Sequence, residues 1–210
     1  MATEELYNKK LLVEGNDDKH VFLALCQQYN VFENFDVVDC KGANFLLRQF
    51  PERLRQSDIE TIGVVIDADT DLNAKWQGIS ATLTLSGFIV PAYIPANGLT
   101  LAHPLSGIKI GVWIMPNNNV NGMLEDFMRF LIPENDALLP IANDALAGIE
   151  NRNFNKYSLA HRSKALIHTW LAWQEEAGKP LGQSITMRYF NTDNETCLKL
   201  INWLNDTFSD

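Results

Sequence analysis

Apolar and polar residues alternate along the first half of the chain in blocks that predict strands followed by helices. Four short apolar runs predict strands, at Lys9–Val13, Phe35–Val38, Thr61–Ile66 and Gly87–Tyr93. Apolar residues at helical spacing predict helices between them, over residues 17–29, 42–55 and 72–85. Pro51 predicts a break or kink in the second helix. Strands alternating with helices are typical of parallel βαβ units, so we expect an α/β fold with a mostly parallel sheet.

The second half of the chain is mainly helical. A short strand is expected between the turns at Asn97-Gly98 and Ser106-Gly107, and Lys109–Met115 predicts a further strand. Later helices are expected over residues 123–131, 137–149, 159–173 and 195–208. We therefore expect one domain, residues 1–210, with an α/β core at 9–115 and a helical extension at 121–210 packed against it.

The composition limits the class of protein. A hydrophobic content of 46% is enough to build a core, and no apolar run approaches the ~20 residues of a membrane span. The segment Met1–Glu5 lacks the basic and apolar regions of a signal peptide. Three scattered cysteines encode neither a disulfide framework nor a zinc knuckle. We expect a soluble cytoplasmic protein with no membrane partner.

The net charge of the chain limits which molecules it can bind. At −9, the chain is acidic overall, and its basic residues form no continuous run. Proteins that hold nucleic acid chiefly by neutralising phosphates are usually basic on at least one face. Strong nonspecific binding of nucleic acid is therefore disfavoured unless metal ions offset the repulsion.

Carboxylates directly follow two of the predicted strands. Glu14 follows the first strand, and Asp67, Asp69 and Asp71 follow the strand at 61–66. If these strands are parallel neighbours, their carboxyl ends share the edge where open α/β sheets bind ligands. Carboxylates gathered there repel one another unless a cation lies between them, and Mg²⁺ prefers oxygen ligands. We expect Asp67 and Asp69, with Asp71 as a further candidate, to hold Mg²⁺ or Mn²⁺, and Glu14 to hold a second ion or act as acid or base.

These acids also fit other patterns. Aspartates often do no more than cap helices and turns. The series Asp67-x-Asp69-x-Asp71 resembles the start of a calcium loop, but Leu72 stands where that loop needs glycine and Gly78 where it needs glutamate. An aspartyl-phosphate transferase of the haloacid dehalogenase type needs threonine or valine where Asp71 stands.

Two of these segments together resemble a known domain. Val13-Glu14-Gly15-Asn16-Asp17-Asp18 followed by Val65-Ile66-Asp67-Ala68-Asp69 is similar to the TOPRIM domain of type IA topoisomerases, bacterial primases and OLD-family nucleases. The whole chain resembles the DUF3226 family more closely still, through residues 111–116, 122–127 and 168–174. The resemblance implies a TOPRIM-like, Rossmann-like fold with Glu-Gly and Asp-x-Asp at a metal site. We assign Asp17 and Asp18 to the start of the first helix.

Further candidates come from later segments and from the first strand. Glu125 and Asp126 follow a predicted strand and turn, and either completes a second metal site, as additional acids do in OLD-like nucleases, or only begins a helix. Lys164 shares a predicted helix face with His161 and His168. This face either brings a cation to a phosphate, as the late lysine of the similar OLD nucleases implies, or is only a solvated helix surface. Lys10 and Lys19, near the first strand, are candidates for phosphate binding.

These observations support three hypotheses about function. The first is magnesium-dependent phosphodiester chemistry on nucleic acid, nuclease-like, with Glu14 and Lys164 as the catalytic residues. The second is a non-catalytic module that binds a nucleotide or a protein. The third is a hydrolase or phosphotransferase that acts on a small nucleotide. Homo-oligomerisation is compatible with each of them. We expect the tryptophans Trp113, Trp170, Trp173 and Trp203 to pack in the core rather than to stack on bases.

Overall fold

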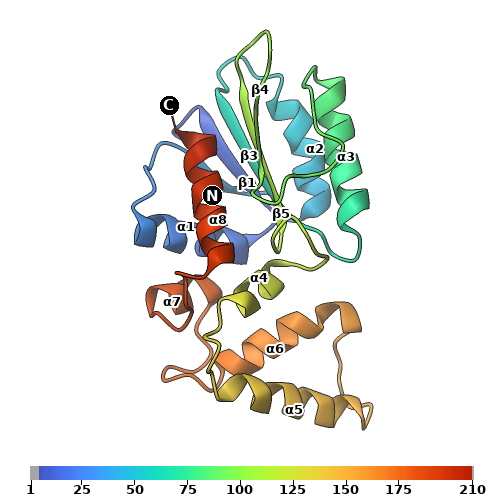
Figure 1. Ribbon diagram of the computed structural model, residues 1–210, viewed down its shortest axis with the longest axis vertical. Helices are drawn as coiled ribbons and strands as arrows, with labels where there is room; N and C mark the ends of the chain where they lie inside the picture. The colour runs from blue at the N-terminus through green and yellow to red at the C-terminus, as the bar shows by residue number, and fades with distance from the viewer. Residues whose placement is uncertain (1–4, 210) are drawn as a thin grey trace.

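A five-stranded sheet forms the centre of the computed structural model, which describes residues 5–209 (Figure 1). Its strands are β1 (Lys9–Val13), β2 (Asp36–Asp39), β3 (Thr61–Asp67), β4 (Leu99–Ala102) and β5 (Lys109–Met115). Their order is β2-β1-β3-β5-β4, and only the edge strand β4 is antiparallel to its neighbour. The expected α/β class with a mostly parallel sheet is confirmed. The acidic start of the chain at residues 1–4 lies outside the described part.

Helices cover both faces of the sheet (Figure 1). On one face lie α1 (Asn16–Tyr29) and α8 (Glu195–Phe208), and on the other α2 (Ala43–Arg53) and α3 (Leu72–Leu85). Neighbouring strand residues point to opposite faces, so Leu11 and Leu12 belong to two separate cores. The remaining helices are α4 (Leu124–Phe130), α5 (Leu138–Glu150), α6 (Arg162–Leu171) and α7 (Leu181–Thr186), with a 3₁₀ turn at Leu159–His161 before α6.

Two glycines on neighbouring strands let α8 approach the sheet. Gly63 of β3 and Gly111 of β5 are direct partners in the ladder. A Cβ atom on Gly63 would lie 2.9 Å from the Phe208 ring, and one on Gly111 would lie 2.5 Å from the Thr207 side chain. The last turn of α8 therefore packs directly on the backbone of the two central strands. In this way the helical extension returns to the α/β core.

Two sequence-based expectations for elements were wrong. Residues 87–93 form no strand, and Pro91 among them has no N–H to donate to a ladder. The place beside β5 is taken instead by β4, the short strand expected between the two turns. The helix α2 is not broken at Pro51 but continues through it to Arg53.

The buried side chains agree with most of the remaining expectations. Trp113, Trp170 and Trp203 are at most 1% exposed, but Trp173 lies beyond the end of α6 and is 42% exposed, so its assignment to the core was wrong. Cys26, Cys40 and Cys197 are buried free thiols. None of the helices in residues 5–209 has the length and hydrophobicity of a membrane span.

Replacing Gly111 with alanine should loosen the contact between α8 and the sheet. The new methyl group would meet Thr207 at 2.5 Å, so α8 or β5 must shift. We expect the free energy of unfolding, measured by urea titration, to fall by about 1–3 kcal/mol. Gly148→Ala is the control, because its methyl group would meet nothing within 4 Å inside α5. That substitution should stabilise by about 0.5–1 kcal/mol, and equal effects at the two sites would contradict the packing described.

Candidate metal centre at the carboxyl edge of the sheet

A cavity of about 580 Å³ opens at the carboxyl edge of the parallel strands. Seven acidic side chains line it: Glu14, Asp17, Asp18, Asp39, Asp67, Asp69 and Glu125. The chain leaves β1 toward β2 on one side and returns to β3 on the other, so the strand order reverses between β1 and β3. Ligands of open α/β sheets bind at such a switch point. Glu14 follows β1 and Asp67 ends β3, which places both carboxylates there.

Backbone amides hold the two central carboxylates in place. Oε1 of Glu14 accepts a hydrogen bond from the backbone N–H of Asp67 at 2.8 Å. Oδ1 of Asp67 accepts one from the backbone N–H of Leu124, at the start of α4, at 3.0 Å. The ends of β1 and β3 and the first turn of α4 are thus joined through two carboxylates. The expectation that β1 and β3 bring Glu14 and Asp67 to one edge is met.

A backbone hydrogen bond between two loops positions Asp69. Its backbone N–H donates to the carbonyl of Gly122 at 2.8 Å, which forms an isolated bridge between the loop after β3 and the loop before α4. Asp69 adopts a left-handed backbone conformation (φ 53°), which aspartate tolerates better than most residues. Its Oδ2 accepts from Nζ of Lys75 at 3.0 Å. The exposed carboxylate of Asp69 therefore lies at the rim of the cavity.

An ion pair connects the helical extension to the cavity. Glu125, in the first turn of α4, is only 4% exposed, and its Oε1 lies 3.1 Å from Nζ of Lys164 in α6. Burial by itself would lower the pKa of Lys164, but the charge and hydrogen bond of Glu125 raise it above its ordinary value. Lys164 is therefore a fixed positive charge beside the acids. The candidates Glu125 and Lys164 both reach the site.

Burial and mutual repulsion raise the pKa values of the central acids. Burial, followed by the charges of the neighbouring acids Glu14, Asp18, Glu125 and Asp69, raises the pKa of Asp67 to about 9. Burial and then the charge of Glu14 raise the pKa of Asp18 to about 7. Burial also raises the pKa of Glu14. The protein holds these carboxylates closer together than their ionised forms favour.

The free oxygens of these acids fit a hydrated divalent cation. Within residues 5–209, no group of three or more His, Cys, Asp or Glu side chains lies in a geometry that could hold a metal ion by itself. Each of Glu14, Asp67 and Asp69 has one oxygen bound by a protein donor and a second with no protein partner among those residues. Mg²⁺ usually binds through one or two carboxylates and keeps several waters. A Mg²⁺ or Mn²⁺ ion bound here would therefore be held by one or two of these carboxylates together with water, and not by an all-protein cage.

Comparison with known proteins places the chain in a family. The sequence model of a family described as "Protein of unknown function (DUF3226)" matches residues 8–209, nearly the whole chain. The chain belongs to the DUF3226 family. Neither the curated proteins nor the solved structures gave a significant match.

Four predicted site residues of this DUF3226 protein do not line the cavity: Asp71, Asp126, Lys19 and Lys10. Asp71 caps α3 instead, because its Oδ1 accepts from the N–H of Ala74 at 2.9 Å. Asp126 caps α4 through the N–H of Met123 at 3.0 Å and accepts a hydrogen bond from Ser163. Lys19 lies in α1 outside the cavity lining. Asp71 and Asp126 therefore cap helices, which was the alternative to a role in metal binding.

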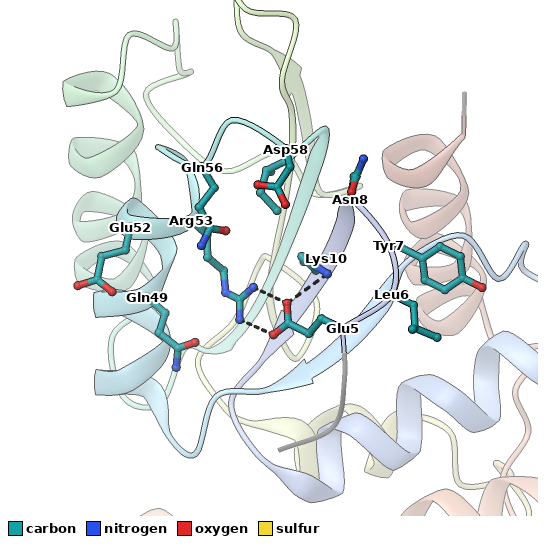
Figure 2. Close-up of a pocket in the computed structure, with 11 residues that line it drawn as sticks. Glu5, Leu6, Tyr7, Asn8, Lys10, Gln49, Glu52, Arg53, Gln56 and Asp58 are labelled. Atoms are coloured by element: carbon teal, nitrogen blue, oxygen red, sulfur yellow. Dashed lines mark hydrogen bonds and ion pairs between the residues drawn. The ribbon is translucent and has the colours of Figure 1, made fainter. Parts of the chain in front are cut away.

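Lys10 belongs to a different cavity of the DUF3226 fold, shown in Figure 2. Its Nζ lies 2.7 Å from Asp36 and 3.1 Å from Glu5, and Arg53 donates two hydrogen bonds of 2.7 Å to the same Glu5. The two basic side chains of this cavity, Lys10 and Arg53, are thus both paired with carboxylates, and together they hold Glu5 beside the sheet. The geometry gives Lys10 a structural role and does not support the predicted contact with phosphate.

Several residues of the cavity were missed by the sequence interpretation. Asp18 was assigned only to the start of α1, yet it is 8% exposed and lines the cavity while its Oδ2 accepts from the N–H of Gly15 at 3.1 Å. Asp39 and Lys41 come from the end of β2 and form an ion pair there. The available signal was a carboxylate at the end of a predicted parallel strand, and Asp39 at the end of β2 fits that pattern as Glu14 and Asp67 do.

The raised pKa of Asp67 predicts how the stability of this DUF3226 protein depends on pH. Its protonated form is favoured in the folded state, so the associated stability is complete below the unfolded pKa near 4 and is lost as pH rises through about 9. Asp67→Asn stays neutral and keeps the acceptor for Leu124. Relative to wild type, the variant should therefore gain stability between these pH values, by at most about 1.4 kcal/mol per pH unit. Urea unfolding at several pH values measures this, and parallel curves would contradict it.

Proposed function

We propose that this cavity supports magnesium-dependent phosphodiester chemistry on nucleic acid, of the nuclease type, in the cytoplasm. The convergence of carboxylates from β1, β3 and α4 on one cavity at the switch point supports this proposal. Glu-Gly after β1 and Asp-x-Asp after a neighbouring parallel strand also agree with a TOPRIM-like relationship. Mg²⁺ is the expected ion, and Mn²⁺ fits the same oxygen donors.

The residues of the cavity have separate roles in this proposal. Glu14, Asp67 and Asp69 would hold the metal through their free oxygens, and Glu125 would extend the site toward α6. When bound, the ion supplies an activated water at neutral pH and positive charge beside the phosphate. The ammonium group of Lys164, already within the cavity lining, balances the negative charge that grows on a phosphate in the transition state. Glu14 accepts or returns a proton through the oxygen that Asp67 does not bind.

The acidity of the chain favours a second candidate. With a net charge of −9, the protein has little to attract the many phosphates of a long nucleic acid, whereas a small nucleotide brings only a few. A hydrolase or phosphotransferase acting on a small nucleotide would use the same residues. A module that binds a nucleotide or a protein without catalysis would keep the cavity but would show no turnover.

Two aspartates in the same loop allow a matched test of the site. Asp67→Asn removes a carboxylate that lines the cavity, and Asp71→Asn removes one that only caps α3, where asparagine caps equally well. We expect Asp67→Asn to lower Mg²⁺- or Mn²⁺-dependent cleavage of single- and double-stranded DNA and RNA by about 100-fold or more. Asp71→Asn should retain wild-type activity.

Metal binding by calorimetry completes this test. Wild type should bind Mg²⁺ or Mn²⁺, Asp67→Asn should bind more weakly, and Asp71→Asn should bind as wild type does. Binding of metal without cleavage of any nucleic acid or nucleotide would favour the non-catalytic module. If wild type showed no metal binding and no cleavage, the proposed function would be ruled out.

A further inference from the structure

A second cavity adjoins the acidic one on the other side of the start of α1. Its volume is about 340 Å³, and it lies between α1 and α7. Asn16 and Asp17 line both cavities. The two cavities are therefore neighbours on either side of the first turn of α1, so one ligand of sufficient length would contact both. Figure 1 shows α7 next to α1, below the sheet.

The walls of this second cavity are held together by a tight helix contact. Gly182 of α7 lies against α1 so closely that a Cβ atom on it would be 2.6 Å from the carbonyl oxygen of His20. Leu181 and Ile185, beside this glycine, are buried in the core that also contains α1. The spacing between the two helices is thus fixed by packing, so the cavity exists before any ligand enters.

The lining combines apolar surface with free hydrogen-bonding groups. Leu23, Ala24 and Pro180 provide apolar surface. Gln27 and Gln183 provide two amide side chains, which are exposed and make no side-chain hydrogen bond within residues 5–209. Each amide offers both a donor and an acceptor. An apolar wall with a few convergent polar groups is typical of sites for small ligands.

The same lining matches a flat heteroaromatic ring. His20 also lines this cavity, and histidine side chains stack on bases in RNA recognition. The edge of a nucleobase carries donors and acceptors that glutamine amides pair with. A sugar offers no aromatic face to stack, and a free phosphate would meet Asp17 and find no lysine or arginine in this lining.

We propose that the cavity between α1 and α7 binds the nucleobase of a nucleotide whose phosphodiester lies in the acidic cavity. This inference rests on the proposed function and assigns its substrate class: a phosphodiester that carries a nucleoside next to the reacting phosphate. Recognition of one nucleoside requires no extended basic surface, which agrees with the net charge of −9. Gln27 and Gln183 then determine specificity, and the metal centre carries out the chemistry.

Two chromogenic diesters separate the base from the phosphate. Thymidine 5′-(p-nitrophenyl phosphate) carries a nucleoside, and methyl p-nitrophenyl phosphate has the same leaving group without one. With Mg²⁺ or Mn²⁺, we expect wild type to prefer the nucleoside ester. Gln27→Ala and Gln183→Ala should each reduce that preference by about 10-fold through a higher KM, the effect of one lost hydrogen bond with its partner left unpaired. Gln77→Ala, at an exposed position of α3 on the opposite face of the sheet, is the control and should leave the preference intact.

The outcomes distinguish this inference from the proposed function. If wild type cleaves both esters and the glutamine variants keep the wild-type preference, the base-binding role is overturned while the phosphodiester chemistry stands. If neither ester is cleaved, the chemistry fails, and the subsite is tested separately by titrating thymidine 5′-monophosphate in an NMR experiment. Shifts of the Gln27 and Gln183 side-chain amide signals that Gln77 does not share would support the subsite, and their absence would overturn it.

Discussion

Repulsion between carboxylates fixed at one sheet edge is the constraint on which the candidate site depends. Parallel pairing of β1 with β3 sets Glu14 beside Asp67, and backbone amides hold one oxygen of each. The chain cannot separate these charges without disturbing its central strands. Their repulsion is relieved only by protonation, by a fixed ammonium group such as Lys164, or by a cation from solution. A protein selected for stability alone would gain by replacing such acids.

Residues next to strand ends were the most predictable part of the site. A long apolar run determines where a strand ends, and a carboxylate directly after it is then placed at the edge of the sheet. Glu14 and Asp67 were found in this way. The sequence did not show which of Glu125 and Asp126 faces the cavity. Successive residues in a first helical turn point about 100° apart, and the orientation of the helix against the sheet decides which one faces inward. That rotation directs Glu125 to the cavity and Asp126 to the N–H of Met123.

Residues whose role depends on distant contacts could not be placed from the sequence. Lys10 precedes Glu14 by four residues and lies near the amino end of β1, where its partner Asp36 begins the neighbouring strand β2. The apolar run at residues 87–93 resembles a strand by composition, but the position beside β5 goes to β4 because of hairpin geometry. Packing of α8 depends on the paired Gly63 and Gly111, which become neighbours only when β3 and β5 align.

The pair formed by Lys164 and Glu125 has a consequence for how the two parts of the molecule communicate. The ammonium group of α6 neutralises a carboxylate that a cation entering the cavity would also attract. Cation binding and docking of α6 on α4 therefore compete for one charge. By thermodynamic linkage, each weakens the other by the same factor. A cation bound at the sheet edge would thereby be coupled to the position of the helical extension through Lys164.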